Sequence, residues 1–167
     1  EECVRYLADV RQARGERSEF SDALKADVAE ALGHIEAAVG KKFGDPSDPL
    51  LVSVRSGARV SMPGMMDTVL NLGLNDETVK GLAASSGDAR FAWDSYRRFI
   101  QMYSDVVLGL DHHLFEDALE IAKEDNGFYA DVEMGEEHWR ALVAEYKAIV
   151  VKGLGRASHA QPLDHDR

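Results

Sequence analysis

Most of this chain carries the spacing of apolar residues that is typical of amphipathic helices, and this feature constrains its fold more than any other. In the first such segment, residues 21–39, apolar residues recur every three or four positions, and Gly40 stands where a helix would end. Three more such segments cover residues 88–108, 111–124 and 136–151. The spacing predicts a mainly helical protein whose last three helices pack as a small bundle.

The same spacing predicts which side of each helix meets the core. Asp88 suits the N-terminal cap of its helix, and Gly109 suits the C-terminal end. The residues expected to face inward are Leu24, Val28, Leu32, Ile35 and Val39 in the first helix, Ala92, Trp93, Tyr96, Phe99, Ile100, Tyr103, Val106 and Val107 in the second, Leu114, Phe115, Ala118, Leu119 and Ile121 in the third, and Trp139, Leu142, Val143, Tyr146 and Val150 in the fourth. After them, the polar residues from Gly153 to Arg167 predict a poorly ordered tail.

One segment near the middle of the chain departs from the helical spacing. Residues 50–54 read LLVSV, a short apolar and β-branched run that predicts a strand buried on both faces. Residues 61–67 have no clean period and include Pro63 and Gly64, so we expect a loop there that leads into a short helix over residues 66–72. The fold class is therefore mainly α with a small β element.

Arg55 ends the expected strand and is the strongest candidate for contact with a ligand. Its guanidinium group can bind two phosphate oxygens at once and stays charged at physiological pH. Ser56, Gly57 and Gly64 would let backbone N–H groups approach an anion, and Thr68 and the N–H groups that begin the following helix would add to such a site. The residues alone leave a second interpretation open, in which Arg55 is solvated or paired with one of the thirty acidic residues.

The overall charge narrows the choice of partners. Thirty acidic residues against nineteen basic ones give a net charge of -11, which repels nucleic acid and anionic lipid, so neither is an expected partner.

Cys3 is the only cysteine, and it has no evident activating neighbour. A reducing, cytoplasmic location is therefore expected. No apolar run approaches the roughly 20 residues that span a bilayer, and Glu1 and Glu2 do not resemble the basic start of a signal peptide.

The histidines give no strong metal or catalytic signal. His112 and His113 are adjacent on an expected helix, where their side chains should point about 100° apart and not share one metal ion. We expect a surface or packing role for both, and a structural role for His138 beside Trp139. No residue of the chain is assigned as a metal ligand.

A longer stretch carries a family resemblance. Residues 49–76 read PLLVSVRSGARVSMPGMMDTVLNLGLND, with KKFGDP before them at 41–46 and RFAWDSYRRFI after them at 90–100. This stretch closely resembles the hallmark of the pyruvate, phosphate dikinase family. The related pyruvate, water dikinases share the Val-Arg-Ser core but usually lack the continuation MPGMMDT. The likeness runs from residue 1 to about residue 151.

The resemblance implies part of an ATP-grasp-type nucleotide-binding domain with an inserted helical subdomain. On this basis residues 1–76 would belong to the nucleotide-binding subdomain, residues 77–152 to the helical subdomain, and residues 153–167 to a tail. In this family ATP gives its β-phosphoryl group to a histidine on another domain, and phosphate takes the γ-phosphoryl group. The phosphohistidine then converts pyruvate to phosphoenolpyruvate at a distant domain.

The resemblance also assigns the site residues. Arg55 matches the catalytic arginine that contacts the ATP phosphates. The ATP-binding set implied in this chain is Arg55, Ser56, Gly57, Gly64, Met65, Asp67 and Thr68. The family's lysine would lie before Glu1, and the acidic ligands of Mg²⁺ and the phosphohistidine would lie outside the chain, in a parent enzyme expected to be a homo-oligomer. We therefore expect the chain alone to bind MgATP weakly. The alternative is a truncated, non-catalytic helical module derived from the same family.

Overall fold

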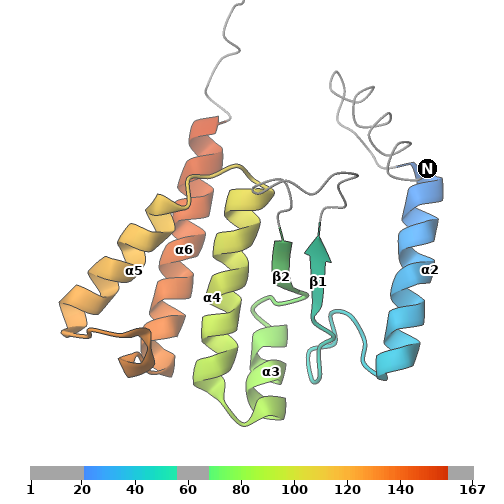
Figure 1. Cartoon of the computed structure of the whole chain (residues 1–167), viewed down its shortest axis with the longest axis horizontal. Helices are drawn as coiled ribbons and strands as arrows, with labels where there is room; N and C mark the ends of the chain where they lie inside the picture. The colour runs from blue at the N-terminus through green and yellow to red at the C-terminus, as the bar shows by residue number, and fades with distance from the viewer. Residues whose placement is uncertain (1–20, 56–67, 158–167) are drawn as a thin grey trace, which may run out of the picture.

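The computed structural model describes residues 21–55 and 68–157 (Figure 1). The elements, labelled as in the figure, are α2 (Asp22–Val39), β1 (Val52–Arg55), β2 (Thr68–Leu72), α3 (Thr78–Ser86), α4 (Ala89–Val106), α5 (His113–Asn126), a 3₁₀ turn η2 (Asp131–Glu133) and α6 (Glu136–Ala157). The protein is thus mainly helical with a small β element, as the sequence predicted. That element is a two-stranded antiparallel sheet, of which only the first strand was expected. None of the helices in these ranges is long and apolar enough to cross a membrane.

The core forms where α4 and α6 pack together, with α5 against α6 and the hairpin against the other side of α4 (Figure 1). Trp139, Tyr146 and Phe115 are fully buried there, and Trp139 and Tyr146 are two of the inward residues that the helical spacing predicted for α6. The Tyr146 hydroxyl donates a hydrogen bond of 2.8 Å to the carbonyl oxygen of Phe115, which ties α6 to α5. The expected three-helix bundle is confirmed.

A buried arginine stabilises the centre of this core. Arg97 of α4 is only 5% exposed, and its guanidinium donates to Asp94 Oδ1 from Nε and Nη2 at 3.1 and 2.9 Å. A third bond, 3.0 Å long, runs from Nη1 to Gln101 Oε1, and the guanidinium carbon lies 5.0 Å from the centroid of the Trp139 ring. Because its hydrogen bonds and charge are satisfied, the guanidinium can be buried without a large desolvation cost.

The helix α3 was missed by the spacing of apolar residues. Its start is marked by Asn75, whose side-chain oxygen accepts from the backbone N–H groups of Glu77 and Thr78 at 2.9 Å each. In the reverse direction, the backbone N–H of Asn75 donates a hydrogen bond of 2.8 Å to the hydroxyl oxygen of Thr78. This reciprocal arrangement is a recognisable start signal. Gly81 lets α3 approach the preceding turn, because a Cβ there would lie 2.1 Å from the Pro46 carbonyl oxygen.

Two predictions about the middle segment were wrong. The strand begins at Val52 instead of Leu50 and is not buried on both faces, since Val54 is 49% exposed. Helix α4 packs against β2, and β1 is the strand farther from this helix. Residues 68–72 form β2 and not a helix. Pairing with β1 holds these residues extended, and the φ of 59° at Asn71 does not fit a right-handed helix.

The helix ends were predicted better than the exposure of the helix faces. Ser21 and Asp88 cap α2 and α4 with their side chains, and Gly40 ends α2 in the left-handed conformation. No residue of α2 is buried by the described part of the chain. Several residues expected to face inward are instead exposed: Val28, Ile35, Val39, Val106, Val107, Leu114 and Ile121. Helix α6 also continues to Ala157, so the first residues of the expected tail are helical.

Candidate phosphate-binding hairpin

At the end of the hairpin next to residues 56–67, two of the predicted site residues lie opposite each other. Arg55 is the last residue of β1, Thr68 is the first residue of β2, and the two are cross-strand partners. The segment between them, residues 56–67, contains the other predicted site residues. Ser56, Gly57, Gly64, Met65 and Asp67 therefore lie outside the described residues.

The pairing also determines which face of the sheet Arg55 presents. Cross-strand partners point to the same face, and successive residues alternate. Val69, paired with Val54, is buried against α4 with only 6% of its surface exposed. Arg55 comes one position after Val54 and Thr68 one position before Val69, so the two share the opposite face, away from α4. Arg55 is exposed there.

This geometry corrects one part of the predicted anion site. Thr68 begins a strand, so the N–H groups after it belong to the sheet and do not form the start of a helix. What remains is a guanidinium group beside a hydroxyl group at a loop closure, a combination that can bind phosphate oxygens from one side. None of the ion pairs among the described residues involves Arg55.

The two strands offer no carboxylate ligand for a hard divalent cation. Mg²⁺ prefers carboxylate and other oxygen ligands in octahedral geometry. The strands read VSVR and TVLNL, and neither contains a carboxylate. Magnesium bound with a nucleotide at this face would therefore take its carboxylate ligands from outside the two strands.

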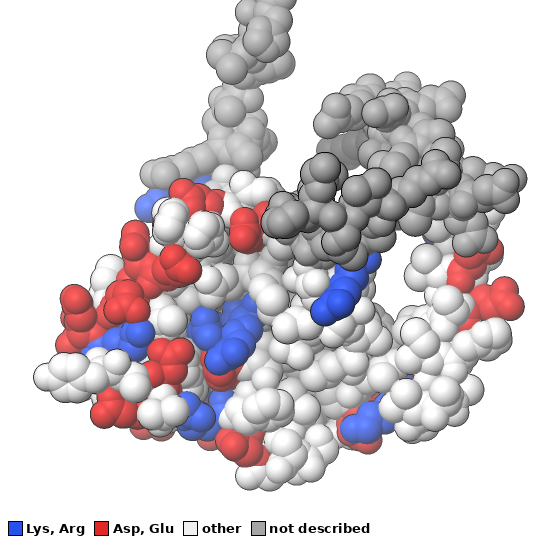
Figure 2. All heavy atoms as spheres, in the orientation of Figure 1, with Lys and Arg blue, Asp and Glu red and all other residues white. Residues whose placement is uncertain are grey.

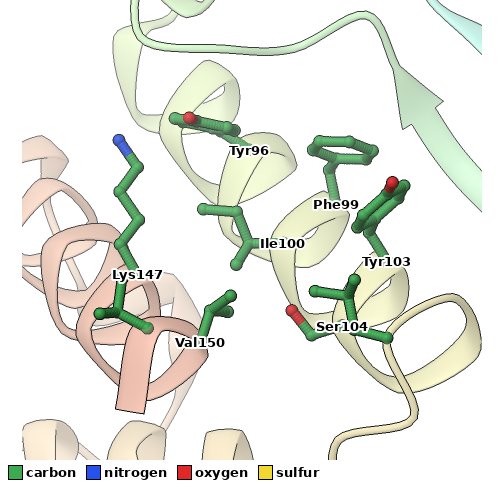
Figure 3. Close-up of a pocket in the computed structure, with 9 residues that line it drawn as sticks. Tyr96, Phe99, Ile100, Tyr103, Ser104, Lys147 and Val150 are labelled. Atoms are coloured by element: carbon green, nitrogen blue, oxygen red, sulfur yellow. The ribbon is translucent and has the colours of Figure 1, made fainter. Parts of the chain in front are cut away.

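A separate, apolar pocket of about 380 Å³ lies between α4 and α6. Figure 3 shows the Lys147 amine and the Tyr96 hydroxyl near one end, with Ile100 and Val150 in the middle. The lining residues are Tyr96, Phe99, Ile100, Tyr103, Ser104, Leu108, Lys147, Val150 and Val151. Neither Arg55 nor Thr68, the two predicted site residues that the structure describes, lines this pocket.

A polar cluster at one end of the pocket ties three elements together. Lys147 of α6 forms an ion pair with Asp76, which lies between β2 and α3, and the Tyr96 hydroxyl donates to Asp76 Oδ1 at 3.3 Å. The hydrogen bond from Lys147 holds the pKa of Asp76 below its usual value. Burial alone would lower the pKa of Lys147, but the hydrogen bond to Asp76 and the nearby charges raise it above its usual value. The cluster therefore favours the charged form of both groups.

Replacing Asp76 with asparagine should reduce stability in a pH-dependent way. The folded pKa of Asp76 lies below the unfolded value of about 3.9, so its stabilisation is present above that value and is lost as the pH falls through the folded pKa. The stabilisation from Lys147 is present below about pH 10.4 and is lost as the pH rises through its raised pKa. The Asp76 and Lys147 side chains are 64% and 39% exposed, so we expect a loss of at most about 1 kcal/mol.

Urea unfolding of the Asp76→Asn variant at a series of pH values would measure this effect. The difference from the unmodified chain should be largest near neutral pH and shrink toward both extremes. Glu145→Gln, the matching change on the exposed surface of α6, should leave the free energy of unfolding nearly unchanged. A difference for Asp76→Asn that is independent of pH would contradict the assignment.

The histidine pair lies closer together than expected. The rings of His112 and His113 have centroids 4.1 Å apart, and the donor atoms of Asp111, His112 and His113 all lie within 4.8 Å of one another. The prediction that the two imidazoles diverge was therefore wrong, because the two rings lie against each other at an interplanar angle of 34°. All three residues are exposed, and none is near the hairpin in sequence.

Charge is distributed unevenly over the surface. Figure 2 shows acidic side chains gathered over α5, whereas the area over the two strands is mostly uncharged. In this view an anion that approaches the two strands avoids the most acidic area.

The hairpin, with an arginine and a hydroxyl at its loop closure, defines a candidate nucleotide-phosphate site, and comparison with known proteins identifies the class. Residues 8–147 match the family described as the pyruvate phosphate dikinase, AMP/ATP-binding domain, and the chain belongs to this family. Among curated relatives, the pyruvate, phosphate dikinase of Rhizobium meliloti is 54% identical over 92% of the chain. The enzymes of Giardia intestinalis and Clostridium symbiosum are 51% and 45% identical over 92% and 98% of it.

The matched region is a small part of those relatives. The chain spans 16% of the length of the Rhizobium and Giardia proteins and 18% of the Clostridium protein. Several other matching dikinases, including one from Arabidopsis thaliana, are named as chloroplastic. The resemblance drawn from residues 49–76 is thus confirmed at the level of the family.

Proposed function

We propose that this chain forms one wall of the ATP cleft of a pyruvate, phosphate dikinase. The observation that carries this proposal is the pairing of Arg55 with Thr68. The pair lies at the end of the hairpin next to residues 56–67, on the face turned away from α4. On that face the guanidinium neutralises phosphate charge as it shifts during transfer, and the Thr68 hydroxyl offers a further hydrogen bond. The intervening loop, with Ser56, Gly57, Gly64, Met65 and Asp67 as its candidate contacts, completes the phosphate-binding surface.

The proposed reaction of the complete enzyme is the one its relatives' name implies. A histidine nitrogen of another domain attacks the β-phosphorus of ATP, and AMP leaves with the electrons of the broken α,β bond. Inorganic phosphate then takes the γ-phosphoryl group and leaves as pyrophosphate, so that one phosphoryl group remains on the histidine. Pyruvate accepts that group as phosphoenolpyruvate. In this scheme Arg55 binds and orients phosphates, and it neither accepts nor donates a proton.

Several finer features belong to the same proposal. The cleft is of ATP-grasp type, with the helices after residue 76 as an inserted subdomain. Mg²⁺ accompanies ATP and supplies charge neutralisation when bound, with carboxylate ligands from outside the two strands. The phosphohistidine domain is the protein partner, and the complete enzyme is a homo-oligomer that works in the cytoplasm.

A second candidate function has one observation in its favour. No residue of α2 is buried by the described residues, although its apolar residues recur with helical spacing. A non-catalytic module derived from the dikinase family would use such a face for binding instead of catalysis. The experiment below separates the two functions.

Labelled ATP tests the proposal in the complete protein that contains this segment. With magnesium and phosphate present, ATP labelled at the β-phosphorus should place acid-labile label on the protein, because a phosphohistidine is hydrolysed in acid. ATP labelled at the γ-phosphorus should place its label in pyrophosphate and leave none on the protein. The absence of protein-bound label from β-labelled ATP would favour the non-catalytic module.

A further inference from the structure

The hairpin contains an irregularity between its two ends. Val52 pairs with Leu72, and Val54 pairs with Val69, so Ser53 alone lies opposite two residues, Leu70 and Asn71. This is a β-bulge, in which one strand contains an extra residue. Asn71 has a φ of 59° and is the only described residue other than glycine with a positive φ. Asparagine is one of the few side chains that tolerate this conformation.

The bulge decides which residue stands beside Arg55. In the register set by Val52 and Leu72, a regular antiparallel ladder would pair Arg55 with Val69. The extra residue shifts the pairing by one, so that Arg55 meets Thr68. A shift of one residue exchanges the faces of a strand. The hydroxyl group of Thr68 therefore points to the face of Arg55, while Val69 points into the core.

The side chain of Asn71 also attaches the bulge to the core. Its Nδ2 donates a hydrogen bond of 3.4 Å to the carbonyl oxygen of Ser95, a buried residue in the middle of α4. The extra residue is thus held at the contact between β2 and α4. Both the backbone conformation and the side-chain hydrogen bond of Asn71 therefore affect the position of the Arg55–Thr68 pair.

We infer that Asn71 is a positioning residue for phosphoryl transfer: its left-handed backbone and its bond to α4 set the register that brings the Thr68 hydroxyl beside the Arg55 guanidinium. This inference rests on the proposed function. Asn71 touches no reacting atom. Its effect is carried by the pairing of Arg55 with Thr68, and it acts only on the half-reaction that uses ATP.

Three substitutions in the complete enzyme separate the two contributions of Asn71. Asn71→Val disfavours the positive φ, and a misplacement of the phosphate contacts by about 1 Å should slow ATP-dependent labelling of the histidine about 100-fold. Asn71→Gly keeps the conformation and loses only the side-chain bond, so the rate should fall no more than about threefold. Asn71→Asp also tolerates the conformation but cannot donate to Ser95, and it should behave like Asn71→Gly.

Two readouts distinguish positioning from a loss of folding. Phosphorylation of the histidine by phosphoenolpyruvate should stay unchanged in all three variants. Asn126→Val, the same change at the exposed end of α5, should leave both half-reactions unchanged. In the double variant of Asn71→Val with Arg55→Ala, the ATP half-reaction should be little slower than in Arg55→Ala alone, because the misplaced group is already absent.

The outcomes keep this inference separate from the proposed function. If Arg55→Ala leaves the ATP half-reaction intact, the proposed function is wrong. If Arg55→Ala slows it and Asn71→Val does not, the inference is overturned and the function stands. Equal loss in both half-reactions for Asn71→Val, or effects of Asn71→Val and Arg55→Ala that multiply in the double variant, would also overturn the inference.

Discussion

Replacing Arg55 with alanine in the complete enzyme is expected to slow ATP-dependent phosphorylation of the histidine about 100- to 1,000-fold, which is the usual cost of removing one group that stabilises charge in a transition state. Arg55 is exposed on the free face of a two-stranded sheet, so its truncation leaves the described core intact. Transfer between phosphoenolpyruvate and the histidine should be nearly unchanged. Single-turnover labelling of each half-reaction measures the two rates separately.

Two control variants make this result specific. Arg98→Ala removes another exposed arginine, which is paired with Asp94 at 3.1 Å on α4, and both half-reactions should keep their rates. Arg55→Lys keeps the positive charge but loses the planar fork that binds two oxygens, so its rate should lie between those of the unmodified enzyme and Arg55→Ala. An equal loss in both half-reactions for Arg55→Ala would indicate misfolding instead of a lost phosphate contact.

The largest loss of stability is expected for Trp139→Ala in α6. The Trp139 side chain is fully buried at the contact of α6 with α4, and its ring lies against the guanidinium of Arg97. Removing the ring leaves a cavity in the core, and the buried guanidinium of Arg97 loses its contact with the ring. The free energy of unfolding should therefore fall by about 3–5 kcal/mol. Urea unfolding followed by circular dichroism measures the change in the 167-residue chain.

An exposed aromatic residue provides the matched control. Tyr129 is 96% exposed, and Tyr129→Ala should change the free energy of unfolding by no more than about 0.5 kcal/mol. Trp139→Phe keeps a ring in the core and should cost less than Trp139→Ala. A loss below about 1 kcal/mol for Trp139→Ala would show that α6 is not packed on α4 as described, because buried aromatic truncations cost several times more.

The helices could be predicted from the sequence because the signals that define them are local. Asp88 and Gly40 act within a few residues of their own position, and the structure places each where the sequence predicted. The reciprocal bonds of Asn75 and Thr78 are equally local, so α3 could have been found from the same kind of signal. The sequence also predicted that Arg55 ends the strand, because it follows an apolar run.

The errors arose where the outcome depends on distant residues. Val54 is exposed because β1 is the strand farther from α4. Ile121 is exposed because α5 packs against α6 along only part of its surface. Residues 68–72 form a strand because β1 is beside them, and the spacing of apolar residues over so short a segment does not distinguish a strand from a helix. The remaining predicted site residues, 56–67, lie outside the described parts of the chain.

The amino-acid sequence by itself determined the helical class, the start of α4, the end of α2, and the family to which residues 49–76 belong. Local hydrogen bonds and side-chain spacing carry the information on the helices, and the resemblance of residues 49–76 to other sequences carries the information on the family. Only the tertiary structure decided that Arg55 stands beside Thr68 and not beside Val69. The pairing depends on a bulge of one residue at Asn71, and strand register is a property of two chain segments and the helix beneath them.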